Sequence, residues 1–144
     1  MHQVYFSLGT NLGDKQANLK MAVNEITKRV GEVTSLSAFY TTEPWGFTSE
    51  NTFLNAVCCV NTSYSPMEVL RITQDIERSL GRLKKSINGT YSDRMIDIDI
   101  LLYDDLQMKT TELTIPHPLM WERDFVMIPL KEIAPDIIKS NYER

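Results

Sequence analysis

Two aspartates, Asp97 and Asp99, carry the clearest chemical signal in this sequence. They alternate with isoleucines in residues 94–103, where β-branched and other apolar side chains dominate, as expected of a strand. Side chains two residues apart in a strand share a face and lie about 6.6–6.8 Å apart, so both carboxylates point the same way while the isoleucines face a core. Because neighbouring like charges repel and strands disfavour aspartate, a divalent cation between the carboxylates explains the pattern best. Oxygen ligands without a cysteine or histidine cluster favour Mg²⁺ carried with a phosphate.

The alternative for this aspartate pair is the solvated face of an edge strand, where charges discourage aggregation. The neighbouring sequence favours the metal site, because four basic side chains lie around the pair: Arg82, Arg94, His117 and Arg123. Taken alone, His117 is typical of a turn histidine bonded to backbone, and Arg123 of a surface residue. Together, carboxylates holding Mg²⁺ with arginine and histidine around them are the parts that phosphoryl transfer requires. No G-x-x-x-x-G-K-[ST] motif is present, so a P-loop enzyme is excluded.

A second group of residues suggests a flat organic ligand. Phe53 and Phe125 are ordinary candidates for a core, but Asn55 lies two residues after Phe53 and so on the same strand face. An amide beside an aromatic ring suits a planar heterocycle.

Composition places these groups in one small domain. At 144 residues we expect a single domain over residues 1–144, and the net charge of −4 argues against a nucleic-acid binder. No apolar run approaches the roughly 20 residues that span a membrane, and the N-terminus lacks a secretory pattern. Cys58 and Cys59 are neighbours in a predicted strand and face opposite sides. We therefore expect reduced thiols and a cytoplasmic protein.

The elements that must position these residues follow from hydrophobic periodicity. Strands are predicted over residues 4–8, 33–40, 53–61 and 94–103, and helices over residues 19–30 and 66–80. The order β-α-β-β-α-β predicts an α+β protein with a ferredoxin-like sandwich, in which two helices cover one face of an antiparallel sheet. The other face is then available for loops and a ligand. A short extended segment over residues 113–118, a short helix near residues 119–122 and a further helical stretch from residue 125 complete the chain.

The chain resembles the 6-hydroxymethyl-7,8-dihydropterin pyrophosphokinases of folate biosynthesis. The resemblance spans nearly the whole chain and is carried by ordered motifs at residues 7–14 (SLGTNLGD), 40–46 (YTTEPWG), 53–55 (FLN), 77–82 (ERSLGR), 94–101 (RMIDIDIL), 115–118 (IPHP) and 123–126 (RDFV). It implies a ferredoxin-like core and transfer of the pyrophosphoryl group of ATP to the hydroxymethyl oxygen of the pterin, with release of AMP. Dihydropteroate synthase is then the expected functional neighbour.

The resemblance also implies roles for particular residues. Asp97 and Asp99 would bind two Mg²⁺ ions, and Arg82 and Arg94 would assist the transfer. The pterin would be bound by Thr42, Pro44, Phe53, Asn55 and Phe125. The nucleotide would be bound by Gln74, Glu77, Arg94, Ile100, Thr114, His117 and Arg123. The polar residues 82–93 correspond to a loop that closes on ATP in this family.

Some positions depart from the family pattern. Many members carry tryptophan, glycine, proline, arginine and threonine before the first strand aspartate, where this chain has residues 91–95 (YSDRM). Some members have an arginine at the position of Thr90, and some have a positively charged group at the position of Glu112. Two other functions stay open at this point. A nucleotidyltransferase would need a third carboxylate and a basic groove, and a non-catalytic binding module would leave the aspartates and arginines idle.

Overall fold

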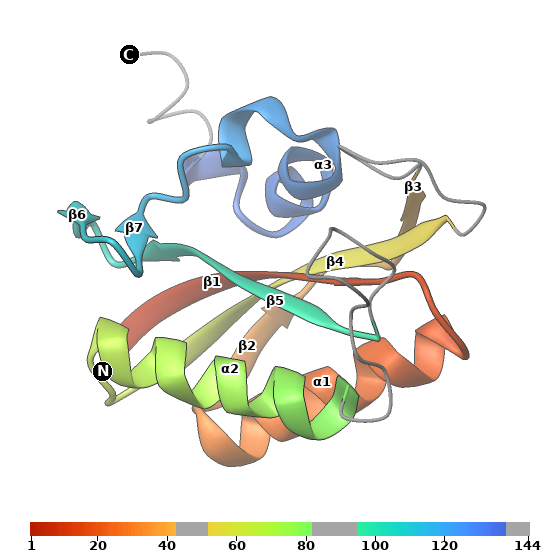
Figure 1. The fold of residues 1–144 in the computed structure, drawn as a ribbon. Coiled ribbons are helices and arrows are strands. Elements are labelled where there is room, and N and C mark those ends of the chain that lie inside the picture. Colours follow the sequence, from red (N-terminus) through yellow and green to blue (C-terminus); the bar gives the residue numbers. More distant parts are fainter. Residues whose placement is uncertain (43–51, 82–94, 138–144) are drawn as a thin grey trace.

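A five-stranded antiparallel sheet organises the chain, and the computed structural model describes residues 1–42, 52–81 and 95–137 of it. The elements of the predicted β-α-β-β-α-β order are β1 (His2–Thr10), α1 (Lys15–Arg29), β2 (Glu32–Leu36), β4 (Phe53–Thr62), α2 (Pro66–Gly81) and β5 (Asp97–Tyr103). The strands lie in the order β2-β4-β1-β5, and β3 (Tyr40–Thr42) pairs with β4 beyond the end of β2. The predicted fold class and sheet are confirmed (Figure 1).

Both long helices begin where local capping favours it. The carboxylate of Asp14 accepts a hydrogen bond from Ala17 N at 3.1 Å, as an N-cap does. At α2, Glu68 N donates to Ser65 Oγ at 3.3 Å, while Glu68 Oε1 accepts from Ser65 N at 2.9 Å. This reciprocal pair satisfies two backbone donors at the start of the helix, and Pro66 occupies its first position.

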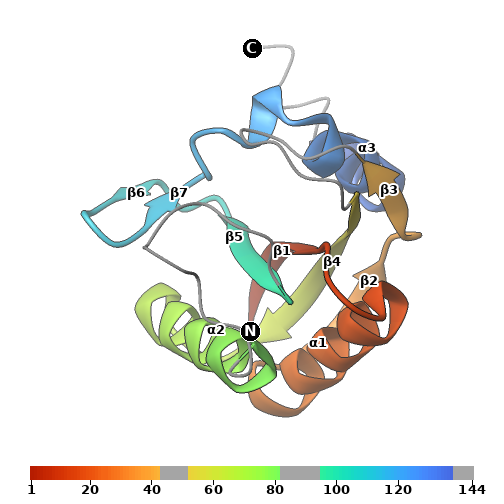
Figure 2. The ribbon, with the colours of Figure 1, turned by 45° about the vertical axis from the view of Figure 1, so that its right-hand side comes forward.

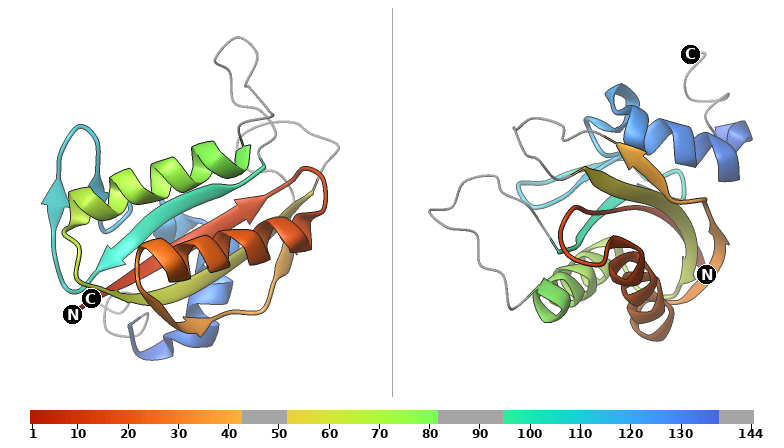
Figure 3. Two further views of the ribbon diagram at one scale, coloured as in Figure 1. Left: turned by 90° about the horizontal axis from the view of Figure 1, so that it is seen from below. Right: turned by 90° about the vertical axis from the view of Figure 1, so that its right-hand side faces the viewer.

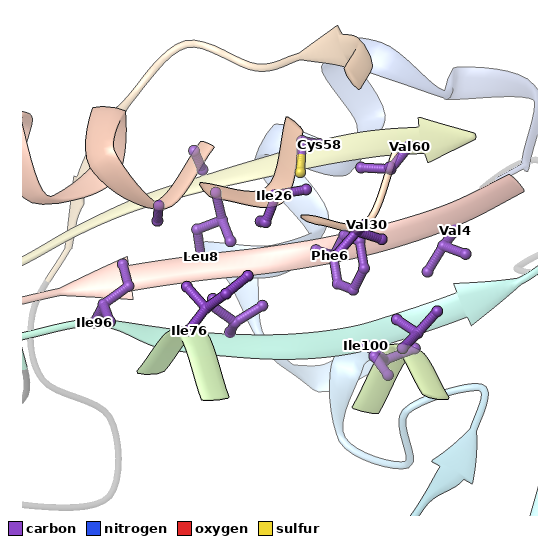
Figure 4. Packing of buried hydrophobic residues seen from close by; sticks show 14 of the residues in the cluster. Val4, Phe6, Leu8, Ile26, Val30, Cys58, Val60, Ile76, Ile96 and Ile100 are labelled. Carbon is purple, nitrogen blue, oxygen red and sulfur yellow. The ribbon is translucent and has the colours of Figure 1, made fainter. Parts of the chain in front are cut away.

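Helices α1 and α2 lie side by side across one face of the sheet (Figure 3). Alternate strand residues point into the core that they cover, which we call the helix-side cluster (Figure 4). Its main members are Val4, Phe6, Leu8, Leu19, Ala22, Ile26, Ala56, Cys58, Val60, Val69, Ile76, Ile96, Ile98 and Ile100. The isoleucines around the aspartate pair therefore face a core, as the alternation predicts.

The opposite face is partly covered by elements added to the predicted core. These are the hairpin of β6 (Met108–Lys109) and β7 (Thr114–Ile115), the 3₁₀ turn η2 (Met120–Glu122) and α3 (Asp124–Ile133). Helix α3 packs over β4 and shares a second core with the strands, the α3-side cluster, which includes Tyr5, Val57, Cys59, Leu101, Leu102, Met120, Val126 and Leu130. Cys58 and Cys59 are both free and buried, and they face opposite clusters.

Irregularities in strand pairing change which face the side chains meet. Between β1 and β5 the register shifts from Phe6↔Ile100 to Tyr5↔Leu102, so Leu101 is one extra residue. Leu101 and Leu102 consequently both face α3. The predicted single strand over residues 33–40 is divided into β2 and β3. Among the helices of the described ranges, none has the length and apolar character that crossing a membrane requires.

Candidate functional site

Three neighbouring strands place predicted site residues in one row across the sheet. Gly9 of β1 pairs with Asn55 of β4 on one side and with Asp97 of β5 on the other. In the next row on the same face, Ser7 lies between Val57 and Asp99. Because directly opposite residues of antiparallel strands share a face, Asn55 and both aspartates lie on the α3 side of the sheet.

Gly9 has no side chain, and the space that one would fill is taken by the Asn55 amide. A Cβ atom at this position would lie 2.9 Å from Asn55 Oδ1 and 3.7 Å from Phe53 Cδ1. Sequence reasoning assigned no role to Gly9, because its importance comes from strand pairing and not from spacing along the chain.

The residues predicted to bind the heterocycle gather where β3 pairs with the start of β4. Asn55 is only 3% exposed, and its Nδ2 donates to Thr42 Oγ1 at 2.6 Å. Thr42 pairs directly with the half-buried Phe53. The bond to Thr42 fixes the orientation of the Asn55 amide, so this end of the sheet offers an oriented amide beside an aromatic ring. Pro44 lies outside the described residues.

Arg123, the residue that precedes α3, lies near the aspartates. Its side chain is only 12% exposed, and its Nη1 lies 4.0 Å from Asp99 Oδ2. Its Cζ lies 5.4 Å from the centroid of the Phe125 ring, which favours a cation–π interaction. Helix α3 therefore delivers a ring and a partly buried positive charge to the face that carries the carboxylates.

Glu77 reaches the aspartates from α2, around the edge of the sheet. Its Oε2 accepts a hydrogen bond from Ile98 N at 2.8 Å, on the edge strand β5. The pKa of the Glu77 carboxyl is raised to about 8, chiefly by burial and in part by the nearby carboxylates of Asp97 and Asp99, against the lowering effect of the Ile98 N–H. Sequence analysis placed Glu77 in the nucleotide site but did not foresee its contact with this strand.

His117 is anchored to the same strand by backbone. Its N–H donates to Leu101 O at 2.9 Å, and its Nδ1 accepts from Leu119 N at 3.2 Å. Burial lowers the pKa of this imidazole, as does the positive charge of Arg123, while Asp97 opposes the shift. The ring is therefore neutral at pH 7, and the bond at Nδ1 places its proton on Nε2. His117 is thus bonded to backbone, as expected of a turn histidine. It also lies near enough to the carboxylate of Asp97 to feel its charge.

The remaining residues predicted to bind the nucleotide are spread over β7, α2 and β5. Thr114 lies half-buried on β7, and Gln74 is exposed on α2, one turn before Glu77. The side chain of Ile100 belongs to the helix-side cluster, on the face opposite the aspartates, so only its backbone faces a ligand there. Arg82, Arg94 and the predicted closing loop over residues 82–93 lie outside the described residues. Within the described ranges, no group of three or more histidine, cysteine, aspartate or glutamate residues could hold a metal ion.

Comparison with known proteins gives consistent matches. The profile of one family, 7,8-dihydro-6-hydroxymethylpterin-pyrophosphokinase (HPPK), matches residues 5–135. A 2-amino-4-hydroxy-6-hydroxymethyldihydropteridine pyrophosphokinase of Porphyromonas gingivalis is 52% identical over 133 residues, covering 92% of this chain and 90% of the relative. One of the same name from Bacillus subtilis is 39% identical over 137 residues, covering 94% and 80%.

Among solved structures, wild-type Plasmodium falciparum HPPK-DHPS with SDX-DHP superposes with a TM-score of 0.70 at 16% identity. The match covers 94% of this chain and 40% of that one. At this identity the match shows a shared fold, and the chain spans well under half of the HPPK-DHPS protein.

Proposed function

The chain belongs to the 7,8-dihydro-6-hydroxymethylpterin-pyrophosphokinase family, and on this premise we propose that it transfers the pyrophosphoryl group of ATP to 6-hydroxymethyl-7,8-dihydropterin in folate biosynthesis. The bond between the β-phosphorus and the oxygen that bridges it to the α-phosphorus breaks. A bond forms between the β-phosphorus and the hydroxymethyl oxygen, whose proton passes to solvent. AMP leaves with the bridging oxygen. Membership of this family disfavours the two alternatives, a nucleotidyltransferase and a non-catalytic binding module.

One observation carries the proposal: Asn55, Gly9 and Asp97 form a row on a single face of three paired strands. An acceptor held at the Asn55 end and a phosphate chain held at the aspartate end would meet beside Gly9, whose lack of a side chain leaves room for the Asn55 amide. Holding two reactants in contact is the main contribution that a protein makes to phosphoryl transfer.

For the acceptor, we assign the pterin to Thr42, Asn55, Phe53 and Phe125, with Pro44 from the adjoining residues. The buried, oriented amide of Asn55 offers both a donor and an acceptor. The half-buried rings of Phe53 and Phe125 suit the faces of a flat heterocycle.

For the donor, we assign Mg²⁺ to Asp97 and Asp99, and the resident groups fit such an ion. Both residues are half-buried with side chains on one face, and carboxylate oxygens are the ligands that Mg²⁺ prefers. Two protein carboxylates leave most of the octahedral positions to water and phosphate, the usual arrangement for Mg²⁺ that arrives with a nucleotide. When bound, the metal, which we expect as two ions, would neutralise charge on the phosphate oxygens.

The other polar groups of this region have assignable tasks in the same reaction. Arg123 supplies a positive charge for a phosphate oxygen, and His117 presents an Nε2–H as a neutral hydrogen-bond donor. We assign Gln74, Glu77, Ile100 and Thr114 to the nucleotide as well, with Ile100 acting through its backbone. Arg82 and Arg94 remain proposed to assist the transfer.

Three further expectations belong to this proposal. We propose that residues 1–144 form one pyrophosphokinase domain, which is supported by a family match from residue 5 to residue 135. We propose the cytoplasm as the location, supported by two free cysteines. A dihydropteroate synthase is proposed as a functional neighbour, supported by the joint name of the solved HPPK-DHPS chains.

The test is to incubate the protein with ATP, Mg²⁺ and 6-hydroxymethyl-7,8-dihydropterin and to separate the products by chromatography. We expect AMP and the pterin diphosphate in equal amounts, and neither when the pterin is omitted or when EDTA replaces free Mg²⁺. Formation of ADP, or of AMP with free pyrophosphate, would show that the proposed transfer is wrong.

A further inference from the structure

The junction between β2 and β3 contains a bulge that turns the second strand over. Leu36 pairs with Cys58, and Ser37 N donates to Val57 O at 2.9 Å, whereas pairing resumes at Tyr40↔Asn55. Two residues, Ala38 and Phe39, therefore lie opposite the single residue Ala56. One extra residue in a strand exchanges its faces.

The bulge determines which side chains of β3 can reach the site. In unbroken register, Leu36, Tyr40 and Thr42 would all share one face with Cys58, which belongs to the helix-side cluster. With the bulge, Phe39 packs toward the helix-side cluster, while Tyr40 and Thr42 share the α3 side with their partners Asn55 and Phe53. The bond from Asn55 Nδ2 to Thr42 Oγ1 exists only in this arrangement.

Glu132, in the last turn of α3, holds the bulge from outside the sheet. Ala38 N donates to both of its carboxylate oxygens, at 3.0 and 3.2 Å, and the Tyr40 hydroxyl donates to Oε1. The pKa of Tyr40 is accordingly raised by its hydrogen bond to Glu132. Helix α3 lies beside β3 (Figure 2), so one carboxylate joins the bulged backbone and the first residue of β3 to this helix.

We infer that Glu132 is a positioning residue for the acceptor: it holds the bulge at Ala38 and Phe39, and through it keeps Thr42 against Asn55. The inference rests on the proposed function, since it assumes that Thr42 and Asn55 bind the pterin. β3 is only three residues long and pairs only with β4 among the described strands. A strand this short frays unless it is anchored, and the carboxylate bonds to backbone and hydroxyl provide the anchor.

A purely structural role for Glu132 would appear as a loss of free energy of unfolding and not as a selective loss of pterin binding. Glu132 and its neighbour Lys131 are both solvent-exposed, and exposed polar interactions contribute little to the free energy of unfolding. The cost of losing Glu132 is therefore expected in the geometry of β3, and so in pterin binding. The residues assigned to ATP lie on α2, β5 and β7, at His117, and at Arg123 at the other end of α3 from Glu132, and we expect them to be unaffected by this junction.

The experiment compares Glu132→Ala, Glu132→Gln and Tyr40→Phe with Lys131→Ala, a matched control on the same turn of α3. Pterin binding is measured by calorimetry in the presence of a non-hydrolysable ATP analogue, and binding of that analogue is measured separately. We expect Glu132→Ala to weaken pterin binding by about tenfold, as the loss of a hydrogen-bonded charge does. Binding of the analogue should match that of the parent protein.

The conservative variants sharpen the result. Glu132→Gln keeps an acceptor for one of the two donors and should recover part of the affinity, and Tyr40→Phe should lose less than Glu132→Ala. The double variant Glu132→Ala with Tyr40→Phe should lose no more pterin affinity than Glu132→Ala alone, because both changes break the same hydrogen bond. If Glu132→Ala does not fold, Tyr40→Phe provides the test: a loss of pterin affinity greater than the loss of nucleotide affinity supports the inference, and equal losses contradict it.

Two outcomes would overturn the inference: pterin affinity like that of Lys131→Ala, or equal losses of pterin and nucleotide affinity. Failure of the proposed function is distinguishable, because the parent protein would then form no pterin diphosphate from ATP. If the parent protein turns over normally and the Glu132 variants bind pterin as it does, only the positioning role is wrong.

Discussion

The two faces of the sheet are built from alternate residues of the same strands, yet they differ in composition. On the side of α1 and α2, β1 contributes Val4, Phe6 and Leu8, all fully buried. On the α3 side the intervening residues begin with Tyr5 and continue with Ser7 and Gly9. The first face is apolar over most of its length, with the buried hydroxyls of Thr10 and Thr62 at strand ends, and the second is apolar only beneath α3.

This difference separates stability from chemistry within single strands. Burial of apolar area supplies most of the stability of a small domain, and two amphipathic helices provide it on one face. The other face can then carry Asn55, Asp97 and Asp99, which contribute little to a core. Changes on the two faces should therefore have separable effects, and the following variants test this.

The largest effect is expected on the helix side. Phe6→Ala removes a fully buried ring and should lower the free energy of unfolding by about 3–5 kcal/mol, as such truncations do. Urea denaturation followed by circular dichroism measures the loss, and binding of pterin per folded molecule should be retained.

Met21→Ala is the matched control, since Met21 lies on α1 with 44% of its surface exposed. A loss for Phe6→Ala no greater than that for Met21→Ala would contradict the division between the faces.

The next effect is expected at the carboxylates. Asp97→Asn should lower turnover by more than about 100-fold, because even residues that only support a metal ligand contribute up to that factor. The free energy of unfolding should stay the same or rise, since the change removes one of two like charges on one strand. Initial rates of AMP formation and urea denaturation measure the two quantities.

Asp105→Asn, in the exposed turn after β5, controls for the loss of one aspartate charge. Turnover that is equal in Asp97→Asn and Asp105→Asn would refute the assignment of Asp97 to the metal.

The smallest effect is expected at Gly9, which lies between the two halves of the site. In Gly9→Ala the new Cβ would lie 2.9 Å from Asn55 Oδ1, so the buried amide must move, and we expect its bond to Thr42 to weaken. Pterin binding should weaken by about tenfold, while binding of an ATP analogue is retained. Calorimetric titration with each ligand provides the measurement.

The control for this variant is Gly81→Ala, where the nearest atom to an added Cβ is Met95 Cβ at 3.9 Å, an ordinary contact. Equal pterin affinity in both alanine variants would show that the absence of a side chain at Gly9 is not needed to position the Asn55 amide.

Much of this arrangement could be predicted from the chain alone. Alternation around Asp97 and Asp99 predicted their shared face, and hydrophobic periodicity over residues 66–80 predicted α2. These features depend on residues within a few positions of one another, so local geometry is sufficient to determine them. The covering of the second face by α3 was not foreseen, because its short apolar segment does not indicate where it packs.

The sequence by itself determined the fold class, the capped helices, the family and the direction of the two carboxylates. Only the tertiary structure decided that Gly9 lies between Asn55 and Asp97, that Glu77 and His117 bind the backbone of β5, and that Glu132 holds the bulge before Thr42. Each of these depends on strand register or on contacts between residues far apart in the chain. A register, and a bulge that exchanges two faces, is selected by the packing of the whole sheet.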